Sequence, residues 1–222
     1  GVLLLCCQLG DAGCRPLSMA QFRELGKRVR ALNRGDPMAE LARGDLVCLG
    51  YEVDDAEKIL RLLDRKAQLE TYLRRASALS ISPITRISAP YPRRISACKR
   101  LSSPPVLFAM GDPALLKKKA VAVVGSREMK AENEEFAKRV GRAAAEEGFV
   151  LVSGGAVGAD TAAQEACLEA GGSCVVLLPD RLTDRSPRKR VLYISENGYD
   201  IPFTAARALQ RNAWQSPGPG SV

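Results

Sequence analysis

The chain has 222 residues, 46% of them hydrophobic, and its 33 lysines and arginines outweigh 25 acidic residues to give a formal charge of +8. A chain of this length can bury one main core and a small second one, and its basic balance favours a polyanionic partner, although charge alone equally allows a basic surface that binds nothing. Histidine is absent, which excludes Ser-His-Asp and Cys-His catalysis and HExxH metal sites.

Cysteine usage indicates a reducing compartment. The spacing of the cysteines contains no CxxC pair, so we expect free thiols in the cytoplasm, with no disulfide framework and no zinc site. The apolar run at residues 2–7 is far shorter than the roughly 20 residues of a membrane helix, so we expect a protein that is neither exported nor membrane-spanning. The seven cysteines are Cys6, Cys7, Cys14, Cys48, Cys98, Cys167 and Cys174.

The first part of the chain has a helical pattern. Apolar residues recur at helical spacing over residues 17–79, which predicts a helical accessory domain over residues 1–80. Ser18 and Asp54 are the candidate N-caps of two of its helices, because their side chains can accept from the free amides of a first turn. Gly35-Asp36-Pro37 predicts a break between these helices.

Residues 81–113 are rich in serine and proline and are predicted to be a connecting segment. Proline prevents a long helix here, so only short extended pieces are expected, such as Val106 to Phe108. The prolines are Pro83, Pro90, Pro92, Pro104 and Pro105, and the same segment carries a basic cluster, Arg93, Arg94, Lys99 and Arg100.

Residues 114–212 alternate between strand and helix. The predicted elements are a strand at Ala120–Val124, a helix at Asn133–Glu147, a strand at Phe149–Val152, a helix at Asp160–Ala170 and a strand at Cys174–Leu178. Apolar strands separated by helices favour a parallel sheet covered on both faces. Right-handed crossovers then predict a doubly wound, Rossmann-like α/β domain. Residues 213–222 are predicted to be a disordered tail.

Two glycine-rich loops follow the first two of these strands, Gly125-Ser126-Arg127 and 153–160. The carboxyl ends of parallel strands meet at one edge, so both loops are expected to face one crevice. Glycine lets an anion approach the backbone, the amides at a helix start can hold a phosphate, and an arginine can grip two phosphate oxygens. The alternative is a pair of tight turns without a ligand. The candidate phosphate-binding residues are Gly125, Ser126, Arg127, Ser153, Gly154, Gly155, Ala156 and Gly158.

Basic residues follow the third strand, between Asp180 and Arg190. We expect them near the same crevice, where Arg188 and above all Lys189 would contact phosphates with strongly salt-dependent affinity. The alternative is a solvated loop. Lys117-Lys118-Lys119 precedes the first strand and is therefore expected at the opposite, amino edge of the sheet.

The two loops also carry a resemblance to a known family. The strings VVGSR at residues 123–127, VSGGAVGAD at 152–160 and AGG at 170–172 resemble the signature of the DprA/Smf family of DNA-processing proteins. The similarity extends over about residues 3–212. Further matching pieces are Tyr91-Pro92, residues 104–108 with Gly111-Asp112, Ile194-Ser195-Glu196, Phe203 and Arg211-Asn212.

This resemblance implies a Rossmann-like, often dimeric protein that binds single-stranded DNA and loads the recombinase RecA during natural transformation. It implies neither catalysis nor a cofactor. Two departures stand out: Ala162-Ala163-Gln164 lies where members carry a histidine, and after Arg211-Asn212 the family continues with further strands and helices. The sequence therefore resembles a member that ends early, with an incomplete sheet.

Two other classes of function stay open. A nucleoside-monophosphate phosphoribohydrolase of the LOG type would have a related fold, but its PGGxGT loop with a following glutamate is missing, and Asp160 and Glu196 are the acidic residues expected near the crevice. The third class is an interaction module whose exposed sheet edge pairs with another chain.

Overall fold

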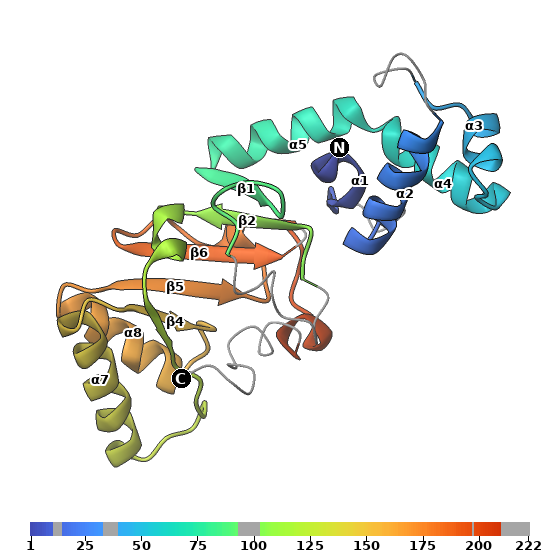
Figure 1. Cartoon of the computed structure of the whole chain (residues 1–222). Helices are drawn as coiled ribbons and strands as arrows, with labels where there is room; N and C mark the ends of the chain where they lie inside the picture. The colour runs from blue at the N-terminus through green and yellow to red at the C-terminus, as the bar shows by residue number, and fades with distance from the viewer. Residues whose placement is uncertain (11–14, 33–39, 93–102, 197, 210–222) are drawn as a thin grey trace.

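The computed structural model describes residues 1–10, 15–32, 40–92, 103–196 and 198–209. A helical region leads into a six-stranded sheet, and further helices cover one face of that sheet (Figure 1). The predicted α/β class and the helical N-terminal region are confirmed. The predicted tail at 213–222, the basic cluster at 93–100 and Arg211-Asn212 lie outside the described residues.

The second helix, α2, begins where its capping residue predicts. Ser18 caps its helix with a capping box: its hydroxyl accepts from the Gln21 amide at 3.2 Å, and its own amide donates to the Gln21 side chain at 2.9 Å. Asp54 was wrongly predicted as an N-cap. The N-cap is Glu52, two residues earlier, and Asp54 lies in the first turn of the helix, where its carboxyl group interacts favourably with the helix dipole. The helices are α1 Val2–Cys6, α2 Met19–Ala31, α3 Arg43–Cys48, α4 Val53–Leu63 and α5 Lys66–Ala78.

The sheet has the order β1-β2-β6-β5-β4-β3. Its last four strands in this order are parallel, as predicted, whereas β2 pairs antiparallel with both β6 and β1. Both β1 and β2 come from residues 81–113, so this predicted connecting segment supplies two strands. The strands are β1 Ile81–Thr85, β2 Val106–Met110, β3 Ala120–Ala122, β4 Val150–Ser153, β5 Ser173–Leu178 and β6 Val191–Glu196.

Alternation along the strands divides the core between the two sheet faces. Cys174 and Val176 of β5 face the helices α7 (Ala131–Glu146) and α8 (Ala159–Glu169). Val175 faces the other side, where it packs in a cluster with Leu115 of the 3-10 helix η1 (Pro113–Lys117). The second 3-10 helix, η2, covers Leu182–Asp184. The sheet is therefore buried on both faces, which explains its nearly continuous apolar strands.

The helical region and the sheet share one hydrophobic core. Tyr72 of α5 packs edge-on against Phe108 of β2, with ring centroids 5.8 Å apart, and against Tyr199 at 4.3 Å. Its hydroxyl donates to Asp200 at 2.5 Å and accepts from the Tyr199 amide at 3.1 Å. These buried contacts fix α5 against the turn that follows β6, beside the carboxyl edge of the sheet. In the described ranges, no helix is long and apolar enough to cross a membrane.

Candidate functional site

The loop after β3 lies at the carboxyl edge of the sheet and is open to solvent. Gly125, Ser126 and Arg127 are all exposed. The Ser126 hydroxyl accepts from the Glu128 amide at 3.2 Å, which forms a local turn. In the described part of the chain, no acidic side chain pairs with the Arg127 guanidinium. This loop thus presents a cation that is available to an anionic ligand.

The loop after β4 needs glycine at two positions. Gly155 has φ +69° and Gly158 has φ +97°, in the left-handed region that other residues avoid. A Cβ on Gly155 would lie 2.8 Å from the Val176 side chain. Another residue at either position would strain the turn, and at Gly155 its side chain would also collide with the buried strand β5.

The two loops touch each other, as predicted. A Cβ on Gly158 would lie 2.3 Å from the Ser126 carbonyl oxygen, and the Ala159 amide donates to that oxygen at 3.1 Å. A Cβ on Gly125 would lie 2.3 Å from the Ala159 Cβ. The start of α8 and the Gly125–Arg127 loop therefore form one continuous surface.

A buried side chain of α8 already uses two backbone amides of the loop after β4. The Asp160 carboxylate, with 3% of the residue exposed, accepts from the Gly154 amide at 2.8 Å and from the Ala156 amide at 3.5 Å. Ser153 is fully buried, and its hydroxyl accepts from the Gln164 side chain. Ser153, Gly154 and Ala156 therefore use their polar groups to shape the loop. The sequence could not reveal that Asp160, six residues further on, returns to these amides.

Arg188 and Lys189 do not lie at this edge, contrary to prediction. β6 runs parallel to β5, with Cys174 paired to Val191. The chain must therefore return to the amino edge before β6 begins, which places these residues away from the loops. Arg188 also forms a two-point ion pair with Glu165, with both N to O distances at 2.7 Å. This hydrogen-bonded pair lowers the pKa of Glu165 and raises that of Arg188. Lys189 is exposed.

One arginine at the carboxyl edge was missed by sequence reasoning. Arg207 donates to the Ser195 hydroxyl at 2.9 Å, to the Glu196 carbonyl at 3.2 Å and to the Ile201 carbonyl at 2.7 Å. Burial lowers its pKa. It holds the turn after β6 in place, and no periodic pattern in the sequence marks it.

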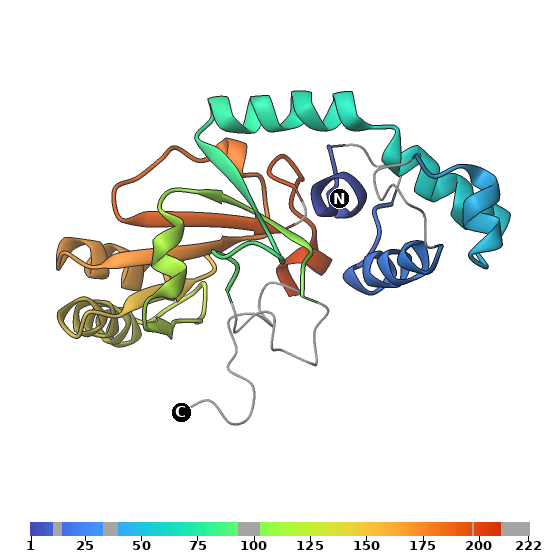
Figure 2. The ribbon, with the colours of Figure 1, turned by 45° about the horizontal axis from the view of Figure 1, so that its top comes forward.

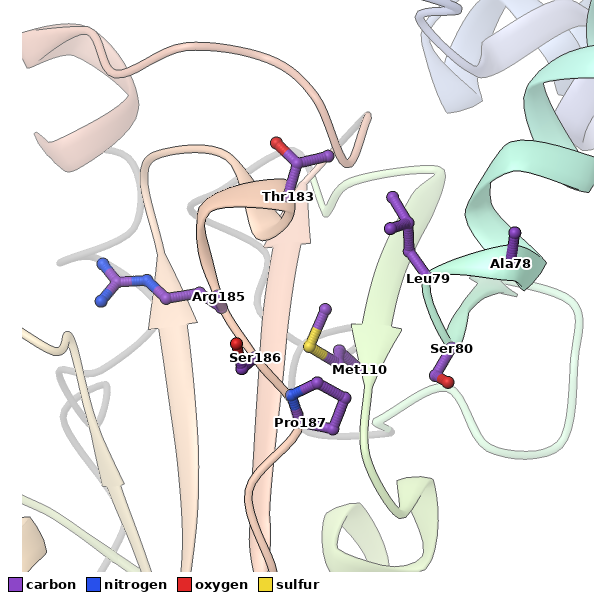
Figure 3. Close-up of a pocket in the computed structure, with 8 residues that line it drawn as sticks. All are labelled: Ala78, Leu79, Ser80, Met110, Thr183, Arg185, Ser186 and Pro187. Carbon is purple, nitrogen blue, oxygen red and sulfur yellow. The ribbon is translucent and has the colours of Figure 1, made fainter.

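A groove of about 290 Å³ lies away from the two glycine-rich loops. It is formed by the end of α5, the end of β2 and the segment around and after η2. Figure 3 shows Met110 between Leu79 and Pro187, whereas the Arg185 side chain points away from them. Arg185 is paired with Asp180 at 3.2 Å. Neither glycine-rich loop lines the groove, so it is separate from the predicted crevice.

These features define a Rossmann-like α/β protein with two glycine-rich loops in contact at the carboxyl edge of parallel strands. The sequence model of one family, described as DNA recombination-mediator protein A, matches residues 82–211. The chain belongs to this family. The resemblance found in the sequence is thus confirmed.

Individual relatives agree with this assignment. The chain is 30% identical over 194 residues to a DNA processing protein DprA of Mycobacterium tuberculosis, found in two strains, covering 83% of this chain and 44% of the relative. The chain thus spans less than half the length of these curated relatives.

Two solved structures have the same fold. DNA processing protein A from Streptococcus pneumoniae matches with a TM-score of 0.65 and 24% identity, covering 93% of this chain and 71% of that one. DNA processing protein A from Helicobacter pylori, whose structure addresses its single-stranded DNA binding mode, matches with a TM-score of 0.51 and 27% identity, covering 63% of this chain and 66% of that one.

Proposed function

We propose that this chain binds single-stranded DNA at the carboxyl edge of β3 and β4. The observation that carries this proposal is the contact between Gly158 and Ser126, because it sets the exposed Arg127 beside the start of α8. The amides at a helix start can hold a phosphate, and a guanidinium beside them can bind two of its oxygens. The single-stranded DNA binding of the Helicobacter pylori relative supports the same class of ligand.

Within this proposal, the loop residues have two roles. Gly125, Ser126 and Arg127, together with Gly155 and Gly158, form the surface that contacts the strand. The internally bonded residues Ser153, Gly154 and Ala156 keep that surface in shape. Arg188 and Lys189 are no longer proposed as contacts, because they lie at the amino edge.

We further propose that the protein acts in DNA uptake and recombination by natural transformation, where it protects single strands and loads RecA. A homodimer and a RecA complex belong to this proposal by family resemblance. Light scattering in solution tests the first, and co-purification with RecA in the presence of a single strand tests the second. The cytoplasm is the proposed compartment, which fits the free thiols of Cys6, Cys7, Cys48, Cys167 and Cys174 in the described ranges.

The proposal includes no catalysis. Asp160 accepts two backbone hydrogen bonds in a buried position, so it is poorly placed to act as a general base on a nucleotide, and the chain has no histidine. Incubation with nucleoside monophosphates tests this point. Release of free base and ribose 5-phosphate by the purified protein, but not by a Glu196→Gln variant, would establish the phosphoribohydrolase alternative.

The central test is fluorescence anisotropy of a labelled thymidine oligonucleotide with wild type, Arg127→Ala and Lys189→Ala at low and moderate salt. Both variants lose one positive charge, but only Arg127 lies at the loops. We expect Arg127→Ala to weaken binding by about tenfold and to make it less salt-dependent, with Lys189→Ala close to wild type. Equal affinities for all three proteins would refute the proposed site.

A further inference from the structure

The helix α2 carries a stripe of cations that the proposed site does not use. Arg23, Lys27 and Arg30 are all exposed, and they follow one another at intervals of four and three residues. At 100° per residue, the three positions fall within about 60° of the helix circumference. We call this surface the α2 stripe. It lies opposite the buried residue Leu25, by which α2 packs into the core.

The side chains of the α2 stripe point into solvent without a hydrogen-bonded partner in the described part of the chain. None of the three forms an ion pair there. The carboxylate of this helix, Glu24, is paired with Arg28 at 2.9 Å, and Arg28 in turn donates to the Leu49 carbonyl at 3.0 Å. Arg28 is thus a structural residue. Its hydrogen bond lowers the pKa of Glu24, and Lys27 contributes to this lowering but does not pair with Glu24.

The position of α2 relates this stripe to the proposed site. In Figures 1 and 2, α1 and α2 lie on the side of the molecule toward which β5 and β6 point. This is the side of the carboxyl edge, where the Gly125–Arg127 loop lies. The shared core around Tyr72 holds the helical region in this place.

We infer that the α2 stripe is a second nucleic-acid surface, which binds the backbone of a single strand that extends beyond the Gly125–Arg127 loop. The inference rests on the proposed function. Arg23 and Lys27 are about 6 Å apart along the helix axis, close to the separation of successive phosphates in an extended strand. Neutralising three phosphates adds steeply salt-dependent affinity without sequence preference. The stripe therefore makes affinity depend on strand length.

The test compares two variants with the same change in charge. One carries Arg23→Gln, Lys27→Gln and Arg30→Gln, and the matched control carries Lys117→Gln, Lys118→Gln and Lys119→Gln at the amino edge. Each is titrated with a thymidine strand of about six nucleotides and with one of about thirty, beside wild type and Arg127→Ala. Circular dichroism melting verifies that every variant is folded.

We expect the α2 variant to bind the long strand about 10- to 100-fold more weakly, with a slope of log K against log salt that is smaller by about 2. Its affinity for the short strand and the affinity of the lysine control for both strands stay at the wild-type level. Wild-type affinity of the α2 variant for the long strand overturns the inference, as does an equal loss in both triple variants. Failure of the proposed function is seen separately, as short-strand binding that Arg127→Ala leaves unchanged.

Discussion

The carbonyl oxygen of Ser126 occupies the space in which a side chain on Gly158 would begin: a Cβ there would lie 2.3 Å from it. The loops after β3 and β4 are therefore held together by backbone contact, and their geometry depends on one glycine. This contact makes the proposed binding surface a single unit and gives the first prediction.

Gly158→Ala is expected to destabilise the protein by about 3 kcal/mol, because alanine adds a steric clash to the strain of φ +97°. Urea unfolding followed by circular dichroism measures the change. Gly148→Ala is the matched control: its φ is +71°, but nothing lies within 4 Å of the added atom. It should cost only about 1 kcal/mol. Equal costs for the two variants would show that the loops separate freely.

Asp160→Ala is expected to lower the free energy of unfolding by about 1–3 kcal/mol, because it leaves the buried Gly154 amide without its acceptor. It should also weaken oligonucleotide binding, since the loop loses its shape. Asp160→Asn keeps an acceptor oxygen and should recover most of the stability. Unfolding and anisotropy titrations on the same samples check both effects. Wild-type stability of the alanine variant would contradict the proposed role of Asp160 in the loop.

Tyr72→Phe is expected to cost about 1–2 kcal/mol, because Asp200 and the Tyr199 amide both lose a hydrogen-bond partner. Tyr193→Phe serves as the control, since no hydrogen bond of the Tyr193 hydroxyl is found among the described residues. Thermal melting distinguishes them. A neutral Tyr72→Phe would mean that ring packing alone joins the helical region to the sheet.

Stability is expected to fall at alkaline pH. Burial raises the pKa of the Cys6 thiol to about 11 and that of Cys7 to about 12, from 9.0. A thiol whose pKa is higher in the folded chain than in the unfolded chain stabilises the protein. This stabilisation is fully present below pH 9.0 and is lost as the pH rises through the folded pKa values. Each thiol adds a slope of up to about 1.4 kcal/mol per pH unit over that range.

Urea unfolding at a series of pH values from about 8 to 11 tests this dependence. Cys7→Ala should flatten the curve, whereas Cys48→Ala, which removes an exposed thiol, should leave its shape unchanged. A curve that is unaltered by Cys7→Ala would assign the alkaline loss to other groups, such as Tyr72, whose pKa is also raised by burial.

Features that depend on neighbouring residues could be predicted from the sequence. The capping box at Ser18, the helices α7 and α8 and the three strands β3, β4 and β5 all follow from periodicity and local hydrogen bonding. The same is true of the glycine-rich loops, because parallel strands separated by helices must bring such loops to one edge. The family signature lies in these local strings.

The placement of Arg188 and Lys189 could not be predicted in this way. It depends on β6, which the pattern of residues 179–196 did not predict, and on the direction in which β6 pairs with β5. Because β6 is parallel to β5, the chain must return from the carboxyl edge to the amino edge before β6 begins. Residues shortly after β5 therefore lie at the carboxyl edge, whereas Arg188 and Lys189, just before β6, lie at the amino edge. The pairing of β1 with β2 and of β2 with β6 is equally invisible in a proline-rich segment.

The sequence by itself determined the α/β class, the helical N-terminal region, the two loops and the family. Each of these rests on interactions between residues close together in the chain, so periodicity and short motifs encode them. Only the tertiary structure decided that Asp160 accepts from the loop amides, that Arg127 is solvent-exposed and that the α2 stripe lies on the same side of the molecule. These relationships depend on which distant segments bury their apolar faces together, and no local pattern specifies that choice.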